Sequence, residues 1–173
     1  MTASPGGATI EGTLHSGGGK GVVRMKCRYA TGIDDLWSAL TDPQRLAHWY
    51  GKVQGELRIG GEFTAFVTAS GWDGHGRIEV CVPPRQLRVS ISEEEGPEEL
   101  VMAELATDGD CTTLAIEVRG MPLDLVWAYG AGWQVHAEDL GSHLAGQDRA
   151  NSDTRWNELE VIYREMAVVP LES

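Results

Sequence analysis

A series of apparent strands between residues 52 and 120, followed by a long helical segment, constrains the fold of this chain most strongly. The breaks between these strands fall at Gly60-Gly61, Pro83-Pro84, Gly96-Pro97 and Asp108–Asp110. Proline cannot donate to a strand ladder and glycine adopts turn conformations, so each break marks a strand end. Successive strands at such intervals predict an antiparallel meander. The acidic segment EEEGPEE is expected to form an exposed hairpin tip.

Two further strands and two short helices are expected before this series. Residues 8–16 and 22–30 have strand character and are joined by the flexible sequence GGGKG. The period then becomes helical, with Thr31 or Asp34 as the expected cap of one helix. Pro43 is well placed to begin a second helix, because the first helical position needs no N–H donor.

A long helix is predicted from about Leu123 to Ala145, with Gly146 as its stop signal. Its apolar stripe consists of Val126, Tyr129, Trp133, Ala137, Leu140 and Leu144. The stripe is uneven in size, because small residues neighbour Trp133. Such a surface either lets the helix approach a sheet closely or leaves an empty volume between the two, and dense packing is the default.

The whole chain, residues 1–173, is expected to form one domain. Residues 1–8 are rich in glycine and alanine and predict a loose N-terminus. Apolar residues at helical spacing predict an extra C-terminal helix within residues 151–168.

His136, Asp139 and His143 share one face of the predicted long helix. A metal site on one helix needs a further ligand and groups that orient the imidazoles, and no such partner is identifiable. The Asp139 carboxylate is expected to point furthest toward solvent. The favoured interpretation is therefore a hydrated helix edge, with no metal and no cofactor, and a metal site is the alternative.

Composition excludes several classes of partner. The formal net charge of −12 opposes binding to nucleic acid or anionic lipid. No run of about 18 apolar residues is present, so no membrane span is expected. The start of the chain lacks the basic and apolar regions of a signal peptide. Cys27, Cys81 and Cys111 are widely spaced, which argues against disulfides and favours the cytoplasm.

Four segments resemble a known family in the order and spacing of their motifs. They are LWSALTDPQRLAHWYG, GELRIGGEF, GRIEVCVPPRQL and GAGWQVHAEDLGSHL. Over residues 22–145 the chain resembles the branch of START-like (SRPBCC) proteins named after the activator of the heat shock protein 90 ATPase. The resemblance implies an α+β helix-grip fold: a curved antiparallel sheet around a long C-terminal helix, with two short helices after the first long strand. Such folds often enclose an apolar cavity, but a fold does not determine a reaction.

The chain departs from the family pattern at two positions. Val80 stands where relatives often have Glu, which removes a candidate acid or base. Ala137 stands where relatives often have Leu, and the smaller side chain enlarges the expected pocket.

We expect a small hydrophobic molecule as the partner, held between the sheet and the long helix. The candidate binding residues are Trp133, Ala137, Leu140, Trp49, Tyr50, Phe63, Phe66, Trp72 and His75. Phe63 and Phe66 face opposite sides of one strand, so only one of them is expected to reach a pocket. Trp49 and Tyr50 have ordinary packing against the rim of the sheet as their alternative role.

Two other functions remain as alternatives, and no catalytic residue is assigned. An enzyme of the polyketide cyclase or aromatase type would need an acid–base group, for which Asp73, His75 and Glu79 are the candidates. A chaperone ATPase-activating cofactor would instead use a protein-facing surface, and the acidic charge is compatible with a basic partner. Whether the chain forms a homodimer is left open.

Overall fold

A computed structural model describes residues 2–3 and 8–171 of the chain. The strands are β1 (Thr2–Ala3), β2 (Thr9–Gly17), β3 (Lys20–Tyr29), β4 (Gly51–Gly55), β5 (Glu62–Val67), β6 (Asp73–Val82), β7 (Gln86–Ser92), β8 (Glu99–Asp108), β9 (Cys111–Pro122) and β10 (Val168–Pro170). The helices are α1 (Ile33–Thr41), α2 (Pro43–Trp49), the 3-10 turn η2 (Leu123–Leu125), α3 (Val126–Leu144) and α4 (Ser152–Arg164).

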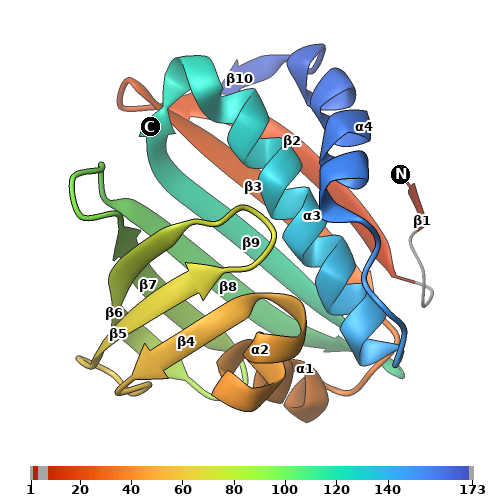
Figure 1. The fold of residues 1–173 in the computed structure, drawn as a ribbon. Coiled ribbons are helices and arrows are strands. Elements are labelled where there is room, and N and C mark those ends of the chain that lie inside the picture. Colours follow the sequence, from red (N-terminus) through yellow and green to blue (C-terminus); the bar gives the residue numbers. More distant parts are fainter. Residues whose placement is uncertain (1, 4–7, 172–173) are drawn as a thin grey trace.

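The strands form one curved sheet that wraps around α3 (Figure 1). Its order is β1-β2-β3-β9-β8-β7-β6-β5-β4, and these neighbours are antiparallel. The short strand β10 pairs with β2 in parallel. The predicted α+β helix-grip fold is thereby confirmed, including the two short helices between β3 and β4.

The starts of the two short helices show which capping predictions hold. α1 begins after Gly32, and the Thr31 hydroxyl donates to the Asp35 carboxylate at 2.6 Å, so neither Thr31 nor Asp34 is the cap. α2 follows the prediction, because Pro43 begins it and the Asp42 side chain accepts from the Gln44 N–H at 2.9 Å.

The long helix begins slightly later than predicted. Leu123–Leu125 form a 3-10 turn, and the regular α-helix runs from Val126 to Leu144. Exposed Leu123 and Leu125 do not contribute to the buried stripe, which explains why the apolar pattern alone misplaced the start. Gly146, with a φ of 69°, ends the helix as expected.

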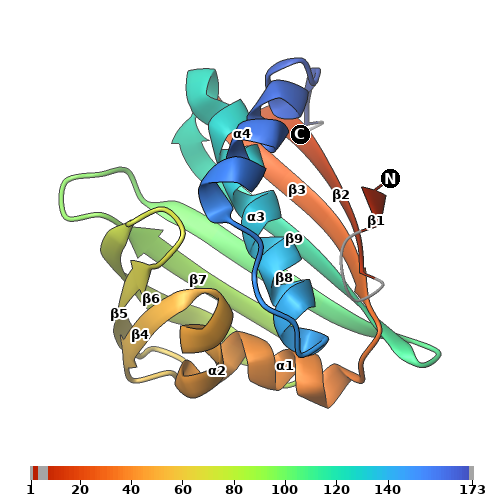
Figure 2. The same cartoon turned by 45° about the vertical axis from the view of Figure 1, so that its right-hand side comes forward.

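The second long helix, α4, packs against α3 and lies in front of it in Figure 2. Leu159 and Tyr163 of α4 are buried against the rest of the core. Gly130 permits this approach, because a Cβ there would lie 2.7 Å from the Tyr163 ring. The expected helix within residues 151–168 corresponds in place to α4.

The N-terminal segment is described only in part. Residues 1 and 4–7 of the expected loose stretch 1–8 lie outside the described residues. Thr2–Ala3 pairs with β2, and Ala8 is buried. None of the helices in the described ranges is long and apolar enough to cross a membrane.

Candidate functional site

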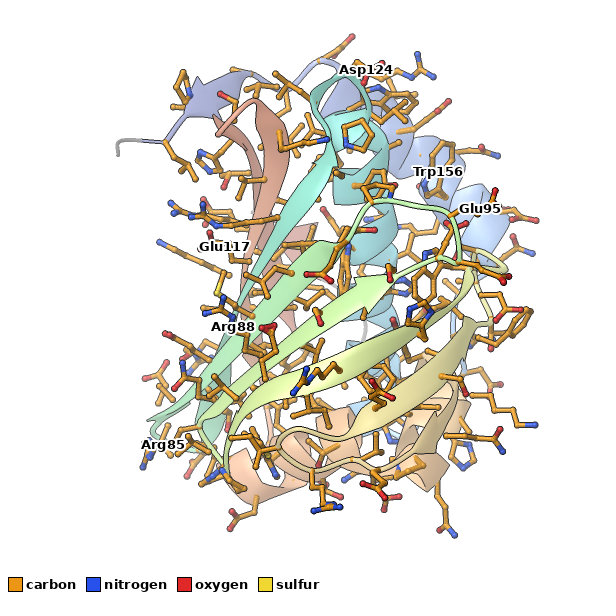
Figure 3. All side chains as sticks on the ribbon, turned by 90° about the vertical axis from the view of Figure 1, so that its left-hand side faces the viewer. Arg85, Arg88, Glu95, Glu117, Asp124 and Trp156 are labelled. Atoms are coloured by element: carbon orange, nitrogen blue, oxygen red, sulfur yellow. The ribbon has the colours of Figure 1, made fainter. Side chains whose placement is uncertain are left out.

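A cavity of about 360 Å³, here called the apolar cavity, lies between the inner face of the sheet and α3. The strands β7, β8 and β9 line it with alternate residues, namely Leu87, Val89, Ile91, Val101, Ala103, Leu114 and Ile116. Their neighbours Arg88 and Glu117 lie on the outer face of the sheet, which Figure 3 shows from that side. The alternation of strand side chains therefore gives the sheet an apolar inside and a charged outside.

Most candidate binding residues lie at this cavity. Trp133, Ala137 and Leu140 line it from α3, Trp49 and Tyr50 from the end of α2, and Phe63 from β5. Two hydrogen bonds hold parts of the cavity lining in place. The Trp49 indole N–H donates to the Ala39 carbonyl at 2.9 Å, and the Tyr29 hydroxyl donates to the Ala137 carbonyl at 2.7 Å.

The other candidates lie elsewhere. Phe66 is 48% exposed on the outer face, because its odd separation from Phe63 turns it to the opposite side of β5. His75 is exposed and shares a hydrogen bond with the Ser92 hydroxyl at 3.3 Å, outside both central cavities. Phe63 is therefore the phenylalanine that reaches the apolar cavity, and His75 lines neither central cavity. Trp72 lines a second cavity, described below.

The predicted acid–base candidates also face outward. Asp73, His75 and Glu79 are exposed on β6, and none of them lines the apolar cavity. A register shift between Ile78 and Val80 breaks the alternation of this strand. As a result Ile78 and Cys81 both line the cavity despite their odd separation.

A second cavity of about 610 Å³, here called the aromatic cavity, lies where the β5–β6 loop, α3 and the start of α4 meet. Its aromatic lining consists of Tyr50, Trp72, Tyr129, Trp133 and Trp156. Tyr50, Ile91, Trp133 and His136 line both cavities, so these side chains form the wall between them.

His136 belongs to this wall and is not on a hydrated edge. The centroid of its ring lies 5.1 Å from that of Tyr50 and 5.5 Å from that of Trp133, with edge-on geometry in both pairs. Burial and, second, the Arg149 charge lower the pKa of His136 to about 4. Its Nδ1 is shielded from solvent and has no hydrogen-bond partner within the described part of the chain. At neutral pH this imidazole is therefore uncharged.

Asp139 also contradicts the hydrated-edge interpretation, since it is only 3% exposed. The chain turns at Gly146 and brings Arg149 back, so that its Nη1 lies 3.9 Å from Asp139 Oδ2. Burial raises the pKa of Asp139 to about 7, although the Arg149 charge lowers it. A helical wheel considers one helix alone, so it could not predict that the segment after α3 packs over Asp139.

His143 diverges from the other two residues of the predicted face. It is half-buried, accepts a hydrogen bond from Arg45 Nε at 3.2 Å, and stacks on exposed His48 with ring centroids 5.8 Å apart. Across residues 2–3 and 8–171, no three His, Cys, Asp or Glu side chains gather as a metal site. His136, Asp139 and His143 therefore lie in three different environments, although they share one face of α3.

The sequence interpretation missed one group at the aromatic cavity. Glu99, assigned to the exposed hairpin tip, is 6% exposed and lines this cavity. Burial and, second, the charge of Glu93 raise the pKa of Glu99 to about 7. Alternation along β8 could have suggested its inward direction, because Val101 and Ala103 on the same side of the strand also point inward.

The cysteines are free thiols. Cys27 is buried, and this burial raises the pKa of its thiol to about 11. Cys81 and Cys111 are half-buried. An uncharged Cys27 thiol is a weak nucleophile.

Comparisons with known proteins place the chain among its relatives. The solved structure of CalU16 from Micromonospora echinospora is similar, with 26% identity, a TM-score of 0.75, and coverage of 91% of this chain and 96% of that chain. DynU16, a protein of the dynemicin biosynthetic locus, has 26% identity and a TM-score of 0.69 over 75% of this chain and 50% of its own. An HSP90 activator from Plasmodium falciparum shares the fold at 20% identity and a TM-score of 0.51, over 58% of this chain and 74% of its own.

No curated protein matches the chain. The family model described as "Activator of Hsp90 ATPase homolog 1-like protein" matches residues 30–145, which is more than half of the chain. This protein therefore belongs to the Activator of Hsp90 ATPase homolog 1-like family.

Proposed function

We propose that this protein binds a small hydrophobic molecule in the apolar cavity. The observation that carries this proposal is a space of about 360 Å³ with an almost wholly apolar lining inside the sheet. Small-molecule sites in proteins have volumes of about 300–1,000 Å³ and combine apolar walls with a few polar groups. Burying apolar ligand surface contributes roughly 25 cal/mol per Å².

The polar groups of the wall favour an uncharged ligand. Burial and, second, the Glu99 charge raise the pKa of Tyr50 to about 12, so its phenol is neutral at pH 7. The His136 imidazole, whose pKa is lowered to about 4 by burial and, second, by the Arg149 charge, is also uncharged at pH 7. A hydroxyl or carbonyl group on an otherwise apolar ligand would pair with these groups and fix its orientation.

One comparison bears on the proposed role, and the cysteines bear on the location. DynU16, which is 26% identical, is described as a protein in the dynemicin biosynthetic locus, and this setting favours a small-molecule role for the present chain. The free cysteines are compatible with the cytoplasmic location that we propose.

The test fills the cavity at Ala137, whose side chain faces it from α3. We expect Ala137→Leu to weaken binding of the neutral fluorescent probe N-phenyl-1-naphthylamine about tenfold, because added methyl groups occupy the ligand volume. Ala47→Leu on the exposed side of α2 is the matched control and should leave binding unchanged. Equal probe affinity in all three proteins would contradict the proposal.

The alternative function, an enzyme, would use titratable residues in the lining of the apolar cavity. Tyr50, Cys81 and His136 are the titratable residues in the lining of the apolar cavity, in place of the predicted Asp73, His75 and Glu79. Mass spectrometry of a ligand recovered after incubation with the protein separates the two functions. An unchanged mass supports binding, and a changed mass supports catalysis.

A further inference from the structure

The aromatic cavity differs from the apolar cavity in its chemistry. Its rings, Tyr50, Trp72, Tyr129, Trp133 and Trp156, come from the end of α2, the β5–β6 loop, α3 and α4. Its polar lining includes the carboxylates of Glu99 and Asp153. No lysine or arginine lines it.

Glu99 is the buried group that requires an explanation. It is 6% exposed, and within the described residues its side chain makes no hydrogen bond or ion pair. A buried carboxylate without a partner is costly, whether it is ionised or kept neutral. A cation placed in the cavity would supply the missing partner.

The aromatic rings provide the second requirement for a cation. The face of an aromatic ring attracts an ammonium group, most strongly for tryptophan, and desolvation increases this attraction. Tyr50, Tyr129 and Glu99 line the same cavity. Rings and carboxylate therefore surround the same space.

We propose that the aromatic cavity binds an organic cation, a substituted ammonium group attached to an apolar body, with the ammonium group against Glu99. This site is distinct from the apolar cavity, so the inference stands without the neutral ligand proposed there. Glu93 is exposed in the loop before β8, and its negative charge acts on this carboxylate. A negative field attracts cations and repels anions.

Small residues on α3 create the space for this ligand. Ala128 and Gly132 line the cavity, and a Cβ added at Gly132 would meet no atom within 4 Å. A larger side chain at Gly132 therefore fills the cavity without a clash at its first carbon. This makes Gly132→Phe a blocking variant that should retain the fold.

The first measurement compares two probes of the same shape by isothermal titration calorimetry. Phenyltrimethylammonium carries a cation, and tert-butylbenzene has carbon in place of the charged nitrogen. We expect the cation to bind at least about tenfold more tightly, since both the carboxylate and the rings distinguish charge. Equal affinity would show that Glu99 acts as a neutral group and would overturn the proposal.

Substitution of the carboxylate provides the matched comparison. Glu99→Gln should weaken phenyltrimethylammonium binding about tenfold and leave tert-butylbenzene binding unchanged. Glu94→Gln removes the same charge from an exposed position of the adjoining loop and should leave the affinity within about twofold. An equal loss of affinity in the two variants would mean that the cation is attracted by the acidic surface in general, and it would contradict the inference.

The blocking variant separates this site from the proposed function. Gly132→Phe should abolish phenyltrimethylammonium binding, whereas Ala137→Leu, which fills the apolar cavity, should leave it unchanged. Retained cation binding in Gly132→Phe would overturn the inference without affecting the proposal for the apolar cavity. Circular dichroism of each variant establishes that the fold is retained.

Discussion

Two sides of α3 differ in how their buried polar groups are paired. One side faces α4, and the other carries His136 and Asp139. On the α4 side, the Tyr163 hydroxyl donates to Gln134 Oε1 at 2.5 Å, and Gln134 Nε2 donates to Glu138 at 3.0 Å. Arg155 donates to both Glu138 carboxylate oxygens, at 2.6 and 2.7 Å. This paired cluster binds α4 to α3 through charge-assisted hydrogen bonds.

On the other side the polar atoms lack such partners. His136 Nδ1, Asp139 Oδ2 and Arg149 Nη1 are shielded from solvent without a hydrogen bond to any described residue. Arg149 and Asp139 approach only to 3.9 Å, too far for a hydrogen bond. Unsatisfied buried groups are rare in native proteins because each costs free energy.

The difference separates the polar groups that hold two helices together from buried polar groups that have no such partners. The paired cluster involving Gln134, Glu138, Arg155 and Tyr163 stabilises the contact between two helices. The unpaired His136 lines both cavities and Glu99 lines the aromatic one. Proteins depart from full pairing mainly at functional sites, so the comparison points to the cavities.

The largest expected effect comes from breaking the paired cluster. Arg155→Ala should lower the free energy of unfolding by about 3 kcal/mol, because it leaves the largely buried Glu138 carboxylate without its cation. Urea denaturation measures this loss. Arg58→Ala is the control, since its ion pair with Glu56 is exposed on both sides and should contribute less than about 0.5 kcal/mol. Similar losses in both variants would show that the cluster has no special role.

A gain in stability is expected on the unpaired side. The folded state raises the pKa of Asp139 to about 7, above the usual value of 3.8, so ionisation destabilises the fold as the pH rises between these values. Asp139→Asn should therefore stabilise the protein by about 2 kcal/mol at pH 8, with the gain vanishing near pH 4. Denaturation at both pH values tests this, with Asp148→Asn as the exposed control of equal charge. A loss of stability at pH 8 would mean that the Arg149 pair is net favourable.

The smallest effect should appear at His136 and has the opposite pH dependence. The folded state lowers the pKa of this imidazole from 6.5 to about 4, so the wild-type protein loses stability as the pH falls through this range. His136→Phe should remove this loss and gain about 1 kcal/mol relative to the wild type between pH 7.5 and pH 5.5. His48→Phe, at an exposed position of α2, should keep the wild-type pH profile. Parallel profiles for all three proteins would place His136 in contact with solvent.

Local patterns predicted the fold and much of the apolar cavity. The period of α3 predicted that Trp133, Ala137 and Leu140 share one face of the helix, and these three residues line the apolar cavity. The alternation of side chains along β5 correctly predicted that Phe63 and Phe66 face opposite sides of the sheet. It did not predict which of the two faces the interior. That choice depends on the face of the sheet on which α3 packs, and no single strand contains this information.

The sequence by itself determined the order of the elements, the family and the apolar stripe of α3, because these follow from spacing within short segments. Tertiary structure decided the surroundings of the polar groups. Arg149 covers Asp139 only after the chain turns back beyond α3, and Glu99 faces rings supplied by the β5–β6 loop, α3 and α4. Burial of a polar group depends on which distant segments pack over it. The periodicity of one segment does not predict these contacts.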